Sequence, residues 1–526
     1  MRDHVIAVDV GTASARAGVF DAAGNLLARC EHPILLRRPG AERGEHDSED
    51  IWQASCKAVR EALAASGIAA GQVAALGFDA TCSLVLRAEN GSKIALAEED
   101  GTTFDTMSWL DHRASAEAEE CTRTGHPVLA HCGEVMSPEM QLPKLMWLKR
   151  QRPDLWAAAG LFFDLADFLT WRATGSTGRS LCTLTAKWNY LAHEGNGWQP
   201  DFLSAIGLDD LIVRGGLPEY GFAVGRPVGV LSPWAATEMG VYPGIPVAAG
   251  MVDAYAGALG VLGPVAADSG EFSRQAALIA GTSSCLVGFA PAPLFGRSIW
   301  GPYFEAIFPG QWLIEAGQSA TGGLLGHLLL SHAQGGGATA AAHQRVIGRI
   351  MEMRAEEGAA FGERISILPD FHGNRSPFAD DRLTGTIAGL TLDASFDGLC
   401  RIYWRACVAI ALGLRQVLER LRTSGFQPER LHLTGGHVRN PLLVELYADV
   451  TRLEIAVTES EDAVLLGTAM NAAAAGGLFA TLPDAGAAMA RPFTALRPNP
   501  ATRTLYDRDF ARFCAMQRHR AELDAL

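Results

Sequence analysis

The sequence lacks an excess of basic residues. Its 526 residues include 44 Lys and Arg against 58 Asp and Glu, which gives a net charge of −14 at pH 7. No stretch of the chain is rich in Lys or Arg. Because binding to a phosphate backbone depends on basic side chains that displace condensed counterions, nucleic acid is excluded as an expected partner.

The sequence also lacks cysteines at the spacings that metal sites require. The ten cysteines include no C-x-x-C pair and no other spacing typical of a zinc site. The N-terminus, "MRDHVIAVDV", leads directly into an apolar segment, without the charged region, hydrophobic region and cleavage site of a secretory signal. We therefore expect reduced thiols and a cytoplasmic location.

Long hydrophobic runs are missing, with one exception. Residues 245–267, "IPVAAGMVDAYAGALGVLGPVAA", are long enough to span a bilayer and carry a single charge, Asp253. Glycines and prolines interrupt the run repeatedly. We interpret it as a strand, a turn at Asp253 and a small-residue helix inside a globular protein, and expect no membrane association.

The chain length indicates two or more domains, because one hydrophobic core does not grow to this size. Strand-like segments at 5–8, 15–20 and 72–80 surround a helical pattern at 49–66, which predicts an α/β domain with a mixed sheet. "LIAGTSSCLVGFA", residues 278–290, resembles the beginning of the chain, and a long helix over 401–425 follows. We therefore predict two similar domains, 1–265 and 266–526, with a cleft between them.

Each half contains a glycine-rich turn after an apolar strand. The turn residues are Gly11, Thr12 and Ser14 in "VIAVDVGTASARAGVF", residues 5–20, and Gly281, Thr282, Ser283 and Ser284 in the second half. Such turns direct successive N–H groups and hydroxyls at one point, as phosphate oxygens require. Asp9, beside the first turn, is suited to hold Mg²⁺ or its waters. The alternative is a pair of plain β-hairpins without a ligand.

Two further features point to a nucleotide site and a catalytic acid. Gly435 and Gly436 follow a strand and precede a helix that starts near Asn440, leaving room for a flat ring such as adenine; an ordinary strand-to-helix turn is the alternative. Asp253 is a lone carboxylate in an apolar turn, so its burial requires a partner or a function. The alternative for Asp253 is a structural role, in which the carboxylate caps a helix and has no part in catalysis.

Four segments, "AVDVGTASARAGVF", "MVDAYAGALG", "IAGTSSCLVGF" and "LTGGHVRNPLLVELYAD", resemble the FGGY carbohydrate kinases in order and separation, and "QLPKLMWLKR" resembles that family's signature. The resemblance covers residues 5–475 and is closest to the pentulose-kinase branch, notably the D-ribulokinases. It implies two RNase H-like domains that close over ATP, Mg²⁺ and a sugar, with Asp253 as the base that deprotonates the sugar hydroxyl. It also allows a homodimer.

The resemblance further implies the sugar pocket. Glu315 and Lys187 resemble ribulokinase substrate contacts, although each has the alternative of a surface charge. Thr81 and Cys82 lie where the family lines the pocket, whereas Asp111 is a pocket residue or the partner of Arg113 in a structural ion pair. No histidine has a metal-ligand spacing.

We therefore expect ATP-dependent phosphorylation of a pentulose, with D-ribulose preferred. Xylulose, ribitol and L-ribulose remain alternatives, because the sequence does not fix the loops that shape the pocket. A non-catalytic sugar-binding relative is the rival from another class, and the presence of both Asp9 and Asp253 argues against it. An Hsp70-like or actin-like ATPase would need a substrate domain, for which the residues after 475 are too few.

Overall fold

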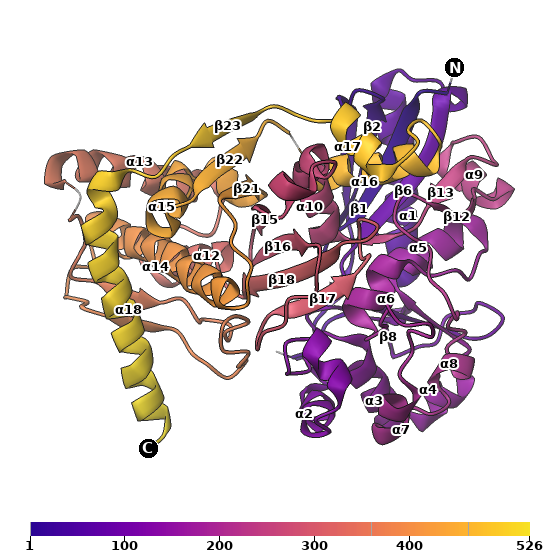
Figure 1. The fold of residues 1–526 in the computed structure, drawn as a ribbon, viewed down its shortest axis with the longest axis horizontal. Helices are drawn as coiled ribbons and strands as arrows, with labels where there is room; N and C mark the ends of the chain where they lie inside the picture. Colours follow the sequence, from indigo (N-terminus) through magenta and orange to yellow (C-terminus); the bar gives the residue numbers. More distant parts are fainter. Residues whose placement is uncertain (1, 41, 359, 461) are drawn as a thin grey trace.

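Two α/β lobes lie side by side, each built on a seven-stranded mixed sheet (Figure 1). The computed structural model describes residues 2–40, 42–358, 360–460 and 462–526. The predicted architecture, two similar α/β units, is confirmed. The boundary near residue 265 stays a prediction.

The N-terminal sheet has the order β12-β13-β6-β1-β2-β3, and β14 also pairs with β6. Its strands are β1 (His4–Val10), β2 (Ser14–Asp21), β3 (Leu26–Pro33), β6 (Val73–Ala80), β12 (Pro227–Val230), β13 (Pro246–Ala248) and β14 (Met251–Val252). Strand β1 is antiparallel to β2 and parallel to β6. Its apolar residues enter two cores: Val5 and Ala7 join one cluster, and Ile6, Val8 and Val10 join another. A continuous apolar run is typical of a strand covered on both faces.

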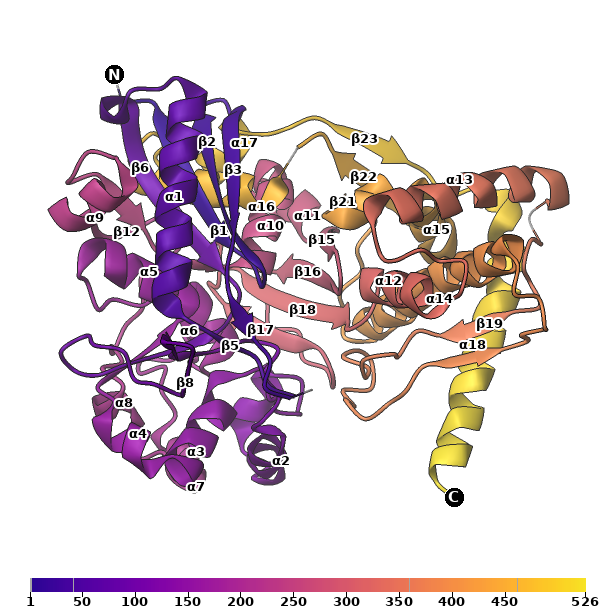
Figure 2. The ribbon, with the colours of Figure 1, turned by 180° about the vertical axis from the view of Figure 1, so that it is seen from behind.

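Helix α1 (Ser48–Ser66) covers one face of this sheet, as Figure 2 shows. The helix begins at Ser48, one residue before the predicted helical pattern. Asp47 is the N-cap and accepts a hydrogen bond from the Glu49 amide (2.8 Å), whereas the Ser48 hydroxyl donates to Asp105 (2.7 Å). Asp and Ser are comparable N-caps, so the choice between adjacent positions follows from the tertiary partner.

A second group of elements completes the N-terminal half. Its small sheet has the order β11-β7-β10-β5-β4. The strands of this sheet are β4 (Leu36–Arg37), β5 (Glu45–His46), β7 (Leu84–Arg87), β10 (Thr106–Met107) and β11 (Leu161–Asp164), while β8 (Ala97–Glu99) and β9 (Thr102–Phe104) form a separate antiparallel pair. The helices are α2 (Ser115–Arg123), α3 (Gln141–Gln151), α4 (Pro153–Ala158), α5 (Leu165–Thr174), α6 (Leu181–Lys187), α7 (Pro200–Ala205), α8 (Leu211–Arg214) and α9 (Pro233–Met239), with 3₁₀ turns at Ala70–Gln72 and Pro127–His131.

The C-terminal sheet repeats the arrangement of the N-terminal one. Its order is β17-β18-β16-β15-β21-β22-β23, and β15 is antiparallel to β16 and parallel to β21, as β1 is to β2 and β6. The strands are β15 (Gln275–Ala280), β16 (Ser284–Ala290), β17 (Trp300–Phe304), β18 (Trp312–Gln318), β21 (Arg430–Thr434), β22 (Glu454–Thr458) and β23 (Phe493–Leu496), with a separate pair, β19 (Ser366–Leu368) and β20 (Thr386–Ala388). The resemblance between residues 5–20 and 278–290 therefore reflects two equivalent hairpins.

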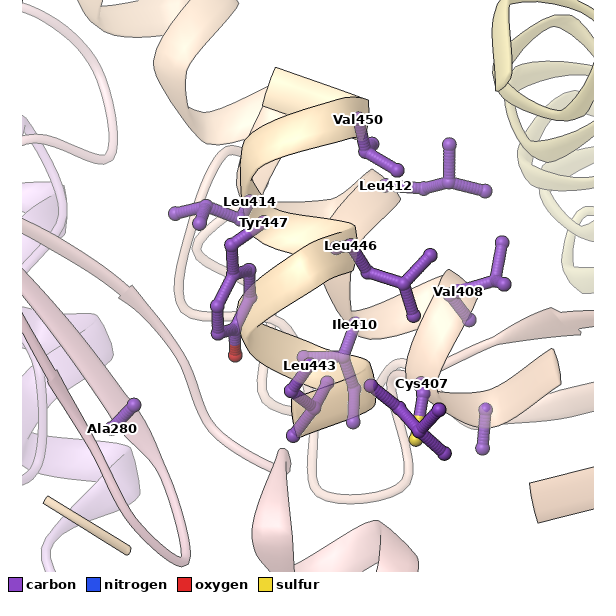
Figure 3. Packing of buried hydrophobic residues seen from close by; sticks show 14 of the residues in the cluster. Ala280, Cys407, Val408, Ile410, Leu412, Leu414, Leu443, Leu446, Tyr447 and Val450 are labelled. Atoms are coloured by element: carbon purple, nitrogen blue, oxygen red, sulfur yellow. The ribbon is translucent and has the colours of Figure 1, made fainter. Parts of the chain in front are cut away.

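The C-terminal core forms around α14 (Phe396–Thr423), the helix predicted over 401–425. Its apolar residues pack against Leu443, Leu446 and Val450 of α15 (Pro441–Thr451), as the close view in Figure 3 shows. The other helices of this lobe are α11 (Ser269–Phe272), α12 (Gly322–Ser331), α13 (Ala340–Glu357) and α18 (Arg503–Asp524), with 3₁₀ turns at Gly436–Arg439 and Pro500–Thr502. A further 3₁₀ turn, Gly263–Val265, follows α10 at the end of the first half.

Residues 245–267 form β13, β14, the helix α10 (Asp253–Leu262) and a 3₁₀ turn, in agreement with the predicted strand, turn and helix. Among the described residues, no helix is long and apolar enough to cross a membrane.

Helix α10 packs against α16 (Ala463–Ala475), which lies with α17 (Leu482–Ala488) against the N-terminal sheet although both come late in the chain (Figure 1). Two glycines allow the close crossing. A Cβ on Gly260 would lie 2.0 Å from the Ala463 carbonyl oxygen, and one on Gly467 would lie 1.9 Å from the Ala256 carbonyl oxygen. No other residue type fits at either position.

Substitution Gly467→Ala should destabilise the protein, because either helix must shift to admit the methyl group. Overpacking of this kind costs about 1–3 kcal/mol. Gly348→Ala is the matched control, since Gly348 lies within α13 and a Cβ there would have no neighbour within 4 Å. Alanine at that position should be neutral or stabilising by about 0.5–1 kcal/mol. Thermal unfolding compares the two variants, and an equal melting temperature for both would contradict the packing argument.

Candidate active site

Three carboxylates lie at the ends of adjacent strands in the N-terminal sheet. Asp9 on β1 is in register with Asp79 on β6, and Asp79 is in register with Met251 on β14, two residues before Asp253. Asp253 is the first residue of α10. Because β1, β6 and β14 run parallel, their carboxyl ends meet at one edge of the sheet, which is where ligands bind in open α/β folds.

Asp9 and Asp79 are fully buried and affect each other's charge. Burial raises the pKa of Asp9 to about 7, against the opposing effect of Arg16, whose guanidinium forms an ion pair with it. Burial and the neighbouring Asp9 carboxylate raise the pKa of Asp79 well above its usual range. The Thr468 hydroxyl of α16 donates a hydrogen bond to Asp79. Two carboxylates this close favour either a shared proton or a nearby cation.

Asp253 has a different environment. Its Oδ1 accepts a hydrogen bond from the Ala254 amide (2.7 Å) at the N-terminus of α10. Burial raises the pKa of this carboxyl above its usual value, while the Ala254 amide, Lys187 and Arg16 oppose the shift. The side chain therefore combines a raised proton affinity with a charge-stabilising helix end, which suits a group that accepts a proton.

The first glycine turn, between β1 and β2, is closed by a hydrogen bond from the Gly11 amide to the Ser14 carbonyl (3.0 Å). Its hydroxyls already have partners among the side chains: Thr12 accepts from the Trp109 indole (2.9 Å), and Ser14 donates to Glu31 (2.6 Å). Phosphate binding by Gly11, Thr12 and Ser14 stays a prediction.

The second turn, between β15 and β16, is one residue shorter, with the Gly281 amide donating to the Ser283 carbonyl (2.8 Å). It is also joined to the start of α12, because the amides of Thr321 and Gly323 donate to the Thr282 carbonyl (2.9 and 3.0 Å). The Thr282 side chain is exposed, whereas Ser284 is buried and pairs with Thr321 (2.9 Å).

Gly435 and Gly436 lie at the end of β21, beside the second turn. A Cβ on Gly435, whose φ is +88°, would lie 2.5 Å from the Ala280 carbonyl oxygen, while Gly436 faces open space. Asn440 is the N-cap of α15, and its Oδ1 accepts a hydrogen bond from the Leu442 amide (3.1 Å). A contact of these three residues with adenosine stays a prediction.

Glu315 and Lys187, from opposite halves of the chain, are both buried and lie close together. Glu315 on β18 accepts hydrogen bonds from the Tyr255 hydroxyl of α10 (2.8 Å) and the Cys285 thiol (3.4 Å). Lys187 ends α6, with its ammonium 4.7 Å from the centre of the Trp300 ring. Burial opposes the charge of Lys187, but Cys82 and Glu315 hold its pKa above the usual value.

The remaining predicted pocket residues are buried, with differing partners. The Thr81 hydroxyl pairs with Ser83 (3.2 Å), and burial raises the pKa of the Cys82 thiol to about 12, which makes it an unreactive small side chain. Asp111 accepts hydrogen bonds on both oxygens, from Arg113 (2.6 and 2.8 Å) and from the Gly44 amide (2.9 Å). Asp111 therefore forms the structural ion pair that was the alternative for it, and its contact with a sugar stays a prediction.

Sequence reasoning missed several residues beside these groups. Asp79 could have been found, because it ends an apolar strand as Asp9 does. Arg16 and Thr468 carry no such signal, since only the fold brings them to the two carboxylates. The same holds for Glu139 and Arg375, which come from loops and meet across the two halves (3.2 Å).

The residues around Asp9 fit a hydrated divalent cation. Among the described residues, no three His, Cys, Asp or Glu side chains gather as a complete metal site. Apart from the Asp9–Arg16 ion pair, however, both oxygens of Asp9 and one of Asp79 are buried without a hydrogen-bond donor in the described chain. Carboxylate oxygens are the ligands that Mg²⁺ and its waters prefer.

Comparison with known protein families identifies the family of this chain. The model of the N-terminal domain of the FGGY family of carbohydrate kinases matches residues 4–260, and that of the C-terminal domain matches residues 276–476. The chain belongs to the FGGY family of carbohydrate kinases. It is therefore a sugar phosphotransferase with ATP as co-substrate, as predicted from the resemblance.

Individual relatives agree in class and differ in substrate. The "FGGY carbohydrate kinase domain-containing protein" of Homo sapiens is 38% identical over 99% of this chain and 98% of its own length. The "D-ribulokinase" of Saccharomyces cerevisiae is 35% identical over 89% of this chain and 71% of its own length. Among solved structures, a xylulose kinase from Rhodospirillum rubrum (TM-score 0.79, 22% identity, 99% of each chain) and a gluconate kinase from Lactobacillus acidophilus (TM-score 0.80, 18% identity, 98% of each chain) share the fold.

Proposed function

We propose that this kinase phosphorylates a pentulose, with D-ribulose as the best substrate and the terminal C5 hydroxyl as the acceptor. The observation that carries the proposal is the position of Asp253. It is the first residue of α10, and it lies close enough to Lys187 and Glu315 for their charges to affect its pKa. The yeast relative named D-ribulokinase supports the choice of sugar, as do bacterial relatives named ribulokinase, such as that of Mycolicibacterium smegmatis at 29% identity.

Asp253 acts as the general base in this proposal. Its carboxylate accepts the proton of the C5 hydroxyl as the hydroxyl oxygen attacks the γ-phosphorus of ATP and the bond to the β–γ bridging oxygen breaks. Phosphoryl transfer needs little covalent help from the protein, so the remaining contribution is positioning and neutralisation of charge.

The two turns supply that positioning. The backbone amides of Thr12 and of Thr282 and Ser283 approach the phosphates from the two lobes, while Gly11 and Gly281, whose amides close the turns, allow the close approach. The Ser14 hydroxyl would have to exchange Glu31 for a phosphate oxygen. Asp9 would hold Mg²⁺ or its waters, and the cation would neutralise charge on the phosphates. Gly435 lets the chain pass close to the Ala280 carbonyl, and Gly436 leaves space beside it for the adenine, with Asn440 at the start of the adjoining helix.

The sugar is oriented by residues of both halves. Glu315 accepts hydrogen bonds from hydroxyls and Lys187 donates to the C2 carbonyl, while Thr81 and Cys82 line the wall. Because Glu315 is already held by Tyr255 of α10 (2.8 Å), the residue that selects the sugar and the helix that carries the base move together. Discrimination between sugars then follows from buried polar groups that the wrong epimer leaves unpaired.

Substitution Asp253→Asn should lower turnover by at least ~10²-fold, which is the scale expected for loss of a general base. Folding and ATP binding should be retained, because the amide oxygen can still accept the hydrogen bond from the Ala254 amide. Steady-state ADP release measures turnover, with circular dichroism and calorimetry as controls. Turnover within a few-fold of the unsubstituted enzyme would remove Asp253 from the mechanism.

The pH dependence of kcat/KM should show the titration of the base. Only the carboxylate form of Asp253 accepts a proton, and its pKa lies above the usual value in the fold. Activity should therefore rise with pH through this raised pKa, with the acidic limb above about pH 4. A profile of the free enzyme tests this, and activity that is already constant at about pH 4 would contradict it.

D-ribulose should give the highest kcat/KM in a panel of C4 to C6 ketoses and polyols. D-xylulose, inverted at C3, should lose at least ~10-fold, because an unpaired buried polar group costs about 1–3 kcal/mol. ADP-release rates for each sugar provide the measurement. Equal or higher efficiency with xylulose, ribitol or a hexulose would overturn the substrate assignment and leave the kinase activity intact.

A further inference from the structure

A loop of the C-terminal half, residues 369–382, follows β19 and brings Arg375 to the residues around Glu315. The Arg375 side chain is largely buried, and its Nη1 lies 3.6 Å from the Cys285 thiol. That thiol is itself 3.4 Å from Glu315 Oε1. The guanidinium is therefore separated from Glu315 by a single small side chain.

Arg375 and Lys187 share an aromatic neighbour. The Arg375 guanidinium carbon lies 5.1 Å from the centre of the Trp300 ring, and the Lys187 ammonium lies 4.7 Å from the same centre. Trp300 begins β17 and is nearly buried. Two cations from opposite halves of the chain thus border one ring, and an aromatic face stabilises each of them.

The loop that carries Arg375 is held in place from several directions. The Ser376 hydroxyl donates to the Ser298 carbonyl (2.9 Å) and accepts from the Gly317 amide (3.3 Å), which fixes it to the segments that lead to Trp300 and away from Glu315. Arg520 of α18 donates to Asp370 (2.6 Å) at the start of the loop. Arg375 is thereby preorganised, as a recognition residue requires.

Glu139, from the N-terminal half, orients the guanidinium. Arg375 Nη2 lies 3.2 and 3.4 Å from the two Glu139 oxygens. Burial disfavours the charge on Glu139, but Arg375 and Lys187 hold its pKa below the usual value. Among the described residues, only Glu139 and Cys285 accept from Arg375. A guanidinium has five N–H donors, so hydrogen-bonding capacity remains for a ligand.

We propose that Arg375, oriented by Glu139, is a specificity-determining sugar-binding residue that donates hydrogen bonds, together with Lys187, to the end of the sugar remote from Asp253. This inference rests on the proposed sugar-kinase site and adds a residue to it. A contact that only joined the two halves would not require the guanidinium to lie against Cys285 and Trp300, which border Glu315 and Lys187. Because Glu139 belongs to one half and Arg375 to the other, recognition by this pair depends on both halves.

The test compares the steady-state kinetics of Arg375→Gln, Arg375→Lys and Glu139→Gln, with the best sugar of the panel and with its C3 epimer. Arg375→Gln should raise the KM for sugar at least ~10-fold, the scale of about 1.4 kcal/mol for a lost charged hydrogen bond, and raise the KM for ATP much less. The ratio of kcat/KM between the two epimers should fall. Arg375→Lys keeps the positive charge but lacks the planar, forked arrangement of N–H donors. Its KM for sugar should lie between those of the unsubstituted enzyme and Arg375→Gln.

Glu139→Gln should raise the KM for sugar less than Arg375→Gln, and the double variant should be no worse than Arg375→Gln, because Glu139 acts through Arg375. Arg405→Gln is the control for loss of a buried ion pair, since Arg405 pairs with Asp509 (2.7 Å) within the C-terminal half. It should lower the melting temperature and leave the KM for sugar unchanged.

A KM for sugar and an epimer ratio within about 2-fold of the unsubstituted enzyme would overturn the role of Arg375. If Arg375→Gln does not fold, the same criterion applies to Arg375→Lys. The two proposals can be contradicted separately. If the unsubstituted enzyme is inactive with every sugar, the proposed function is wrong. If it is active and the Arg375 substitutions change neither the KM for sugar nor the epimer ratio, only the inference about Arg375 is wrong.

Discussion

The close contact between α10 and α16 determines the position of the residues that we propose for the chemistry of this protein. Gly260 and Gly467 let the two helices meet at backbone distance, which fixes the N-terminus of α10 and hence Asp253. The same contact lets Thr468 of α16 reach Asp79, and Asn471 donates to the Ala249 carbonyl (2.8 Å) just before β14. One helix from late in the chain thus secures the strand ends of the N-terminal lobe.

Burial of three carboxyl groups at those strand ends costs free energy, which other interactions in the fold have to offset. Asp9, Asp79 and Asp253 each have a raised pKa, and burial is the largest cause for all three. An apolar side chain at any of the positions would be easier to bury. Arg16 compensates in part by its ion pair with Asp9 and its approach to Asp462 (3.5 Å), the N-cap of α16. The remaining electrostatic strain is the kind that a bound cation relieves.

The sequence allowed prediction of the fold class, both hairpins and the place of Asp253 between a strand and a helix, because each depends on a short local pattern. Three local patterns can be recognised without knowing what packs against them: an acid after an apolar strand, a glycine turn and a lone charge in an apolar run. The position of α16 on the N-terminal sheet was not readable, since its residues, mostly apolar apart from Thr468 and Asn471, indicate burial without indicating which part of the protein covers them. The Glu31 partner of Ser14 was not readable for the same reason, whereas Arg113, two residues from Asp111, was already an alternative partner in the sequence.

Charge around the proposed sugar site bears on the substrate more than the fold does, because the same fold occurs in a gluconate kinase and in a xylulose kinase. Lys187 and Arg375 lie close to Glu139 and Glu315, so two cations are balanced by two carboxylates before any ligand binds. A sugar acid would add a negative charge to a site whose cations already have partners, and Asp253 lies nearby with a charge of its own. A neutral polyhydroxy substrate avoids this repulsion and still uses every donor and acceptor. The electrostatics therefore favour a sugar or polyol over an aldonate.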